Sequence, residues 1–251
     1  MLHYEIAGPA KARPIMLSSS LGTTLEMWDP QMDALTEHFR VIRFDHRGHG
    51  RSPANGECSI ADLGGDVLEL LDRLELPVVS FAGLSLGGML GMWLAAHAPE
   101  RIDRLALLCT SAKLSTPEFW SERANAVREG GTASIAEAIT ARWFTPGYGG
   151  REPYIAMLAG ISAEGYAACC EAIGGMDLRS DLPLIKAPTL VLAGADDPAT
   201  PPEHAERIVS GIPGSVLAVL PGAAHLANVE QPEAVSRHLI EHFRQETTTA
   251  V

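Results

Sequence analysis

Residues 83–87 read Gly-Leu-Ser-Leu-Gly, a G-x-S-x-G pattern that can present a serine hydroxyl as a nucleophile. An apolar run at Val78–Ala82 precedes the pattern, and a small, apolar stretch at Leu86–Ala98 follows it. This order predicts a strand, a sharp turn and a helix. The two flanking glycines let the strand and the helix approach closely, and Gly88 adds room. The alternative is a glycine-rich turn with an incidental serine, but the flanking elements favour Ser85 as a nucleophile.

A serine hydroxyl is a weak nucleophile unless a base removes its proton. His225 follows the apolar run Val216–Leu220, and Asp197 follows the run Thr189–Ala193. If these runs are parallel strands, both side chains lie with Ser85 at the carboxyl edge of one sheet, where open α/β sheets build their sites. The chain order of serine, acid and histidine is typical of hydrolases with such a turn. The sequence therefore predicts a catalytic triad for acyl transfer.

Two adjacent carboxylates compete for the acid position in this triad. Asp196 and Asp197 both follow the same predicted strand. We favour Asp197, because Pro198 directly after it fixes the turn.

The remaining elements have to place these residues at one edge of a sheet. Ile60–Leu76 has apolar residues at spacings of three and four, with Ser59 as a plausible N-cap, and Gln231–Phe243 has a similar apolar face. Short apolar runs alternate with such helical patterns, which predicts a mostly parallel α/β sheet of about seven strands flanked by helices. Runs of this kind are typical of strands buried on both faces. The other runs are Pro14–Leu17, Val41–Phe44 and Leu105–Cys109.

The alternation stops between residues 113 and 181. This segment has helical patterns and no convincing strand, and it holds seven of the 14 aromatic residues. We interpret it as a helical cap over the carboxyl edge of the sheet. The predicted domains are a core of residues 1–112 and 182–251 and a cap of residues 113–181.

Composition excludes several function classes. The chain of 251 residues has a formal net charge of −12, which disfavours nucleic-acid binding. Its longest apolar runs are far shorter than the ~20 residues that span a bilayer, so no membrane partner is expected. The amino terminus shows no signal-peptide pattern. Four cysteines without a C-x-x-C pair predict reduced thiols in the cytoplasm.

No motif indicates a cofactor or a metal. The sequence has no P-loop and no G-x-G-x-x-G, so nucleotide cofactors lack support. His238 and His242 form an H-x-x-E-H pattern, but they lie near the chain end on an amphipathic helix and are expected to face solvent. The loop from Asp45 to Gly50 also holds histidines, and we expect its Asp and Arg to brace neighbouring loops.

Over essentially its full length the chain resembles the α/β-hydrolase superfamily. Within that superfamily several segments are similar to the enol-lactonases, and the Ser-Leu-Gly at 20–22 in place of a common His-Gly favours that similarity. The resemblance implies hydrolysis of 3-oxoadipate enol-lactone through an acyl-enzyme, without a cofactor. It also implies that the usual first strand is short or absent. The similar segments are Ser20–Thr23, Met27–Asp29, Phe44–Ser52, Gly83–Gly88, Arg142–Phe144 and Met176–Arg179.

The resemblance also assigns further site residues. It places the acid at Asp197 and the two oxyanion-hole donors at the N–H groups of Leu21 and Leu86. A small anionic lactone needs a cation in an acidic protein, and Arg142 with Trp143 is the assigned substrate contact. Other cap cations remain open as alternatives, namely Lys113, Arg123, Arg128 and Arg151.

Three other functions remain open from the sequence. One is a general carboxylesterase, and another is a cofactor-free haloperoxidase or perhydrolase. The third is a non-catalytic ligand receptor on the same scaffold, which sustained turnover of any ester would exclude. The sequence carries no prediction of oligomeric state.

Overall fold

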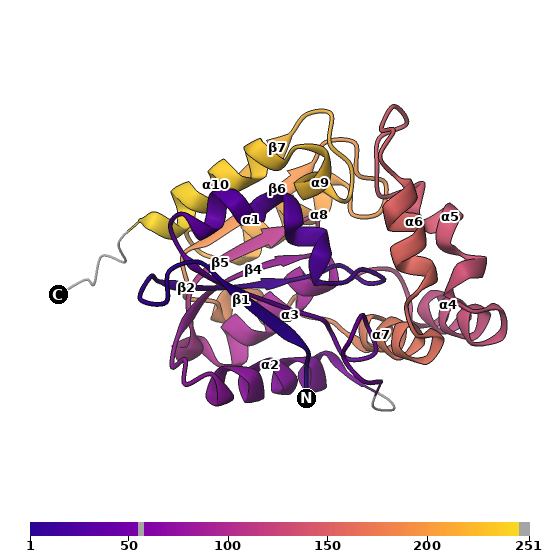
Figure 1. Ribbon diagram of the computed structural model, residues 1–251, viewed down its shortest axis with the longest axis horizontal. Coiled ribbons are helices and arrows are strands. Elements are labelled where there is room, and N and C mark those ends of the chain that lie inside the picture. Colours follow the sequence, from indigo (N-terminus) through magenta and orange to yellow (C-terminus); the bar gives the residue numbers. More distant parts are fainter. Residues whose placement is uncertain (55–57, 246–251) are drawn as a thin grey trace.

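The computed structural model describes residues 1–54 and 58–245. A seven-stranded sheet lies between layers of helices (Figure 1), in the order β1-β3-β2-β4-β5-β6-β7. Among the described strands, only β1 runs antiparallel to its neighbour, so the predicted fold class is confirmed. The strands are Tyr4–Ala7 (β1), Pro14–Ser18 (β2), Arg40–Phe44 (β3), Val79–Leu84 (β4), Ile102–Leu108 (β5), Thr189–Gly194 (β6) and Val216–Leu220 (β7).

The two edges of the sheet differ from the prediction. All residues of β4 and β6 are buried, as their apolar runs predict. In β7, however, Val216 is 61% exposed and Val219 is 42% exposed. The prediction of burial on both faces was wrong for β7, because it is an edge strand paired only with β6. The sequence also missed β1, whose mixed polar residues pair with β3 in the register Glu5↔Arg43 and Ile6↔Ile42.

Helices cover both faces of the sheet. Helices α1 and α10 pack together on one face, and α2 and α3 pack together on the other (Figure 1). Ser59 caps α2 as predicted, because its Oγ accepts a hydrogen bond from Asp62 N–H while the Asp62 carboxylate accepts one from Ser59 N–H. These helices and the shorter ones of the core are α1 (Asp29–Thr36), α2 (Ile60–Arg73), α3 (Leu86–His97), α8 (Pro202–Gly211), α9 (Ala227–Glu230), α10 (Pro232–Arg244), η1 (Leu25–Trp28), η2 (Pro99–Arg101) and η4 (Leu182–Leu184).

Residues 113–181 are all described, and none of them belongs to a strand. Their helices gather beside the sheet (Figure 1), with α4 packed on α7. Gly165 of α7 lies against Gly48 of the core. A Cβ atom added to Gly48 would lie 2.2 Å from the Gly165 Cα, so the two backbones are in contact. The division into a core and a cap remains a proposal. The helices of this segment are α4 (Pro117–Gly130), η3 (Thr132–Ser134), α5 (Ala136–Thr140), α6 (Glu152–Ala159) and α7 (Ala163–Gly175).

The histidines of α10 do not simply face solvent. His242 Nε2 is buried and has no hydrogen-bond partner among the described residues, so the expected exposure was wrong for this residue. The reason is that α10 packs against β5. Burial and the charge of Arg104 lower the pKa of His242 to about 4. In the described ranges, no group of three or more His, Cys, Asp or Glu side chains could hold a metal ion.

None of the helices that the structure describes is long and apolar enough to cross a membrane.

Candidate active site

Ser85 occupies a strained turn between β4 and α3. Its φ of 56° and ψ of −112° lie in a region that non-glycine residues rarely adopt. A Cβ atom on Gly83 would lie 2.0 Å from Gly87 O, and one on Gly87 would lie 2.3 Å from Ser18 O. Thr110 Oγ1 donates a hydrogen bond of 2.6 Å to Ser85 O. The glycines are therefore required by the close approach of strand and helix, and the turn is fixed by its neighbours.

The structure brings Asp197, and not Asp196, to the predicted base. Asp197 Oδ2 lies 2.8 Å from His225 Nδ1, and both residues are buried. The other Asp197 oxygen accepts hydrogen bonds from Ala199 N–H and Thr200 N–H, at 2.7 and 3.1 Å. Burial alone would raise the pKa of Asp197, but the charge of His225 and hydrogen bonds from His225 and Thr200 lower it overall. Asp196 is exposed.

Ser85 and His225 open into one pocket beneath the cap. Its walls combine the predicted nucleophile and base with apolar side chains and two arginines, Arg123 and Arg142. An apolar pocket with a few polar groups is the usual form of a small-molecule site. The other lining residues are Ser20, Leu21, Leu114, Trp120, Ile139, Trp143, Tyr166, Ile173 and Ala199.

Among the residues of this region that the structure describes, two backbone N–H groups have no hydrogen-bond partner. Ser20 N–H donates to Met27 Sδ and Gly22 N–H donates to His49 Nε2, so both neighbours of Leu21 are engaged. Within the described residues, the N–H of Leu21 itself makes no hydrogen bond.

Leu86, the residue after the predicted nucleophile Ser85, has a backbone N–H in the same situation as that of Leu21. Ser85 N–H donates to Leu108 O at 2.9 Å, and Gly87 N–H donates to Ser19 O at 3.1 Å. The N–H of Leu86 between them is unpaired in the part of the chain that the structure describes. This pattern fits two donors kept available for a developing oxyanion, but their role remains a prediction.

Two buried histidines, which the sequence did not assign to the site, hold the loop that carries Leu21. His46 Nε2 lies 3.0 Å from Ser19 O, and His49 Nε2 accepts from Gly22 N–H at 3.0 Å. Burial lowers the pKa of His46 to about 4 and, together with the charge of His46, lowers that of His49 to about 3. Both rings are therefore neutral near pH 7. Their position after β3 was visible in the sequence, but nothing in it linked them to the loop after β2.

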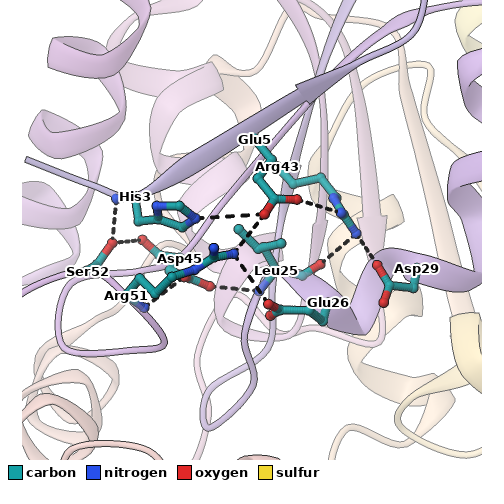
Figure 2. A network of polar contacts seen from close by, with 9 residues as sticks. All are labelled: His3, Glu5, Leu25, Glu26, Asp29, Arg43, Asp45, Arg51 and Ser52. Atoms are coloured by element: carbon teal, nitrogen blue, oxygen red, sulfur yellow. Dashed lines mark hydrogen bonds and ion pairs between the residues drawn. The ribbon is translucent and has the colours of Figure 1, made fainter.

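The same segment braces the loop from the other side, as predicted for its Asp. Figure 2 shows Asp45 between two backbone N–H groups, those of Leu25 at 2.8 Å and Arg51 at 3.0 Å. Arg43 extends this network by donating to Leu25 O and to Glu5 Oε2. Leu25, three residues after Gly22, is thus held at both its N–H and its C=O.

The cap segment that holds Arg142 and Trp143 is tied to the acid and base loops. Arg142 Nη2 donates to Pro198 O at 3.0 Å, and Leu226 N–H donates to Trp143 O at 2.8 Å. Arg142 is exposed, whereas Trp143 is buried. The predicted substrate contacts therefore lie next to the predicted triad.

Glu230 makes a second link that the sequence analysis missed. One carboxylate oxygen accepts from Thr145 N–H and Thr145 Oγ1, at 2.8 and 2.7 Å. The other oxygen accepts from Ala224 N–H at 2.6 Å, directly before His225. No short motif marks Glu230, since its partners are 6 and 85 residues away.

The other candidate cations of the cap have different surroundings. Arg123 lies 4.9 Å from the ring centres of Phe119 and Trp120 and lines the pocket. Arg128 pairs with Glu164 and Glu171, at 2.8 and 2.5 Å. Lys113 pairs with Asp177 at 3.2 Å. Arg142 and Arg123 are thus the cations placed to meet a ligand beside Ser85.

Comparison with known proteins gives a consistent family. A family model described as the alpha/beta hydrolase fold matches residues 13–149, and a model described as TAP-like protein matches residues 170–250. The 3-oxoadipate enol-lactonase 2 of Acinetobacter baylyi is 43% identical over 96% of this chain and 91% of its own length. The crystal structure of the enol-lactonase from Burkholderia xenovorans LB400 has a TM-score of 0.94 at 41% identity, covering 97% of this chain and 96% of that chain. A thermophilic esterase from Thermogutta terrifontis has a TM-score of 0.91 at 30% identity, covering 97% and 93%.

Proposed function

This chain belongs to the alpha/beta hydrolase fold family, and on that premise we propose that it is a serine hydrolase that opens 3-oxoadipate enol-lactone to 3-oxoadipate. The observation that carries the proposal is one pocket that holds the strained Ser85 and His225, with His225 bonded to Asp197. The relatives named as enol-lactonases supply the substrate class.

Ring opening begins at the strained serine. Ser85 Oγ attacks the lactone carbonyl carbon while His225 Nε2 takes the hydroxyl proton. Asp197 holds the imidazole through Nδ1 and stabilises its positive charge. The N–H groups of Leu21 and Leu86 bind the oxyanion, and each such donor is worth roughly 3–4 kcal/mol in the transition state.

The tetrahedral intermediate then collapses and the ring C–O bond breaks. The leaving oxygen departs as an enolate, which tautomerises to the ketone and needs less help from an acid than an alkoxide does. His225 gives the proton that it took from Ser85 to this leaving group. It next takes a proton from a water molecule that attacks the acyl ester, and it passes this proton to Ser85 Oγ as the acid is released. No step requires a metal or an organic cofactor.

The substrate carries a carboxylate, and the pocket offers Arg142 and Arg123 for it. We assign Arg142 as its partner, with the buried Trp143 and the apolar wall against the lactone ring. The small anionic lactone is thus the proposed partner. The four cysteines are free, which suits a reducing compartment, and we propose the cytoplasm as the location.

The function is tested by initial rates on 3-oxoadipate enol-lactone and on p-nitrophenyl acetate with the same enzyme preparation. We expect kcat/KM on the lactone to exceed that on the acetate ester by at least two orders of magnitude. A comparable or higher value on the acetate ester would overturn the lactone assignment while leaving a serine hydrolase.

A general carboxylesterase is the second candidate. It is favoured by the apolar part of the pocket wall, formed by Leu114, Ile139 and Ile173, and by the similar esterase structure. A neutral ester of matching size would be accepted by such a wall without using either arginine.

A further inference from the structure

A second pocket lies beside the loop that follows β5. We call it the basic pocket, and its volume is about 510 Å³. It shares no lining residue with the pocket at Ser85. Three segments distant in the sequence form it: the loop after β5, the segment that returns from the cap, and α8. The lining residues are Ser111, Ala112, Lys113 and Ser115, then Arg179 and Leu182, then His204, Arg207, Ser210 and Gly211.

The cations of this pocket outnumber its carboxylates. Lys113 and Arg179 both pair with one carboxylate, Asp177, at 3.2 and 2.6 Å. Arg207 makes no hydrogen bond or ion pair within the described residues. The pocket lining thus has three cations and no carboxylate, with Asp177 beside it, in a chain whose formal net charge is −12. A local excess of positive charge against that background attracts small anions.

A histidine completes the polar lining. His204 Nδ1 lies 2.7 Å from Ser111 Oγ, and Ser111 Oγ lies 2.6 Å from Lys113 O. Because a carbonyl oxygen can only accept, the single hydroxyl proton of Ser111 goes to Lys113 O, and His204 Nδ1–H must be the donor to Ser111. The neutral ring therefore has its proton on Nδ1, and Nε2 gains a proton only when the ring becomes charged.

The charge on His204 depends on what fills the pocket. Burial and the charge of Arg207 lower its pKa, while Asp197 and Glu203 act in the opposite direction. Lys113 and Arg179 also line the pocket, and both pair with Asp177. An anion bound there would favour the imidazolium and turn Nε2–H into a further donor.

We propose that the basic pocket is a second ligand site, separate from the proposed active site, that binds a small dianion through Arg207, Arg179 and His204. The three cations of the lining suit the two negative charges of a dianion, and the hydroxyl of Ser115 suits an oxygen ligand. Dicarboxylates and tetrahedral oxyanions share this chemistry. Binding is accompanied by uptake of a proton at His204.

Isothermal titration calorimetry at pH 6.5 tests the site with adipate as the dicarboxylate and sulfate as the tetrahedral oxyanion. We expect saturable binding of one ion per chain. Substitution Arg207→Gln should weaken Kd about 10-fold or more, as the loss of one charge-assisted contact requires. The matched control is Arg237→Gln, which removes an arginine of α10 that is also exposed and should leave Kd unchanged. Tighter binding of adipate or of sulfate identifies which class the site takes.

A second readout separates this site from the proposed active site. Titration with adipate in two buffers of different ionisation enthalpy should show uptake of a fraction of a proton, and His204→Gln should abolish the uptake. Loss of binding in Arg142→Gln but not in Arg207→Gln would place the anion beside Ser85 and overturn the proposal. Binding that neither arginine affects, or no saturable binding in the millimolar range, would also overturn it. None of these outcomes depends on turnover of the lactone.

Discussion

At the residue scale, the chemistry depends on a backbone conformation that the chain holds under strain. The φ of 56° at Ser85 is kept by hydrogen bonds at both its N–H and its C=O. Strain of this kind costs on the order of 1–3 kcal/mol and persists only when the surroundings impose it. Here β4, α3 and the loop after β5 impose it together, so the hydroxyl is presented to the pocket before any substrate binds.

Replacement of the nucleophile should remove turnover and leave the fold intact. For Ser85→Ala we expect kcat to fall by roughly 10⁴-fold or more, with a residual rate from the oxyanion donors alone. Steady-state rates on the lactone, with circular dichroism to check folding, measure this. The matched control Ser121→Ala removes an exposed serine from α4 and should keep wild-type kcat. Retention of more than a few per cent of kcat in Ser85→Ala would reject the nucleophile assignment.

The neighbouring carboxylates provide a test of the acid. Asp197→Asn should lower kcat by about 10⁴-fold, because an amide favours the wrong tautomer of His225. Asp196→Asn is the matched control, since it makes the same change on the exposed neighbour and should alter kcat by less than about 2-fold. If the two variants showed the reverse order, the acid would be Asp196.

At the element scale, the sequence predicted the features that depend on local residue spacing. It missed the contacts between residues that are distant in the chain. Local spacing predicted the strand, turn and helix around Ser85, and all three are present. It also predicted Ser59 as the N-cap residue of α2, which the structure has. The edge position of β7 depends on which strand lies beside it, and an apolar run does not reveal that. Glu230 was missed for the same reason, because its partner Thr145 belongs to the cap segment.

His46 and His49, which hold the loop that carries Leu21, make the stability of the folded protein depend on pH. Both pKa values are lowered in the folded protein, to about 4 and about 3, whereas an unfolded histidine has a pKa near 6.5. The unfolded chain therefore binds more protons below pH 6.5. The contribution of the two neutral rings to stability is complete above pH 6.5 and is lost as the pH falls toward the folded values.

This linkage predicts the effect of His49→Gln. In wild type, His46 and His49 should each lower the free energy of unfolding by up to ~1.4 kcal/mol for every unit by which the pH falls between pH 6 and pH 4.5. Urea titrations across this range measure the slope. His49→Gln should reduce the slope by about that amount, while the glutamine oxygen can still accept from Gly22 N–H. The exposed His38→Gln is the control and should keep the wild-type slope. An unchanged slope in His49→Gln would show that this ring is not held neutral.

At the scale of the whole molecule, the net charge opposes the proposed substrate. A formal charge of −12 repels an anionic lactone and its dianionic product, so the pocket must reverse the sign locally. We expect Arg123 and Arg142, which line the pocket, to provide this reversal, and both come from the proposed cap rather than from the sheet that holds the proposed triad. We therefore propose separate roles for the two parts. The sheet carries the residues that cleave the ester, and the cap determines which acids enter.

Arg142→Ala tests this division directly. A charge-assisted contact is worth ~1.5–3 kcal/mol, so kcat/KM on the anionic lactone should fall by about 10–150-fold. A neutral ester of similar size should lose less than about 2-fold, because it makes no use of the charge.

The hydrogen bond from Arg142 to Pro198 O supplies a competing explanation for a loss of activity, since Pro198 follows the proposed acid Asp197. Equal losses on both substrates would mean that Arg142 supports the acid loop. Loss on the lactone in Arg123→Ala, with none in Arg142→Ala, would transfer the carboxylate contact to Arg123, which lies over Phe119 and Trp120 and lines the same pocket.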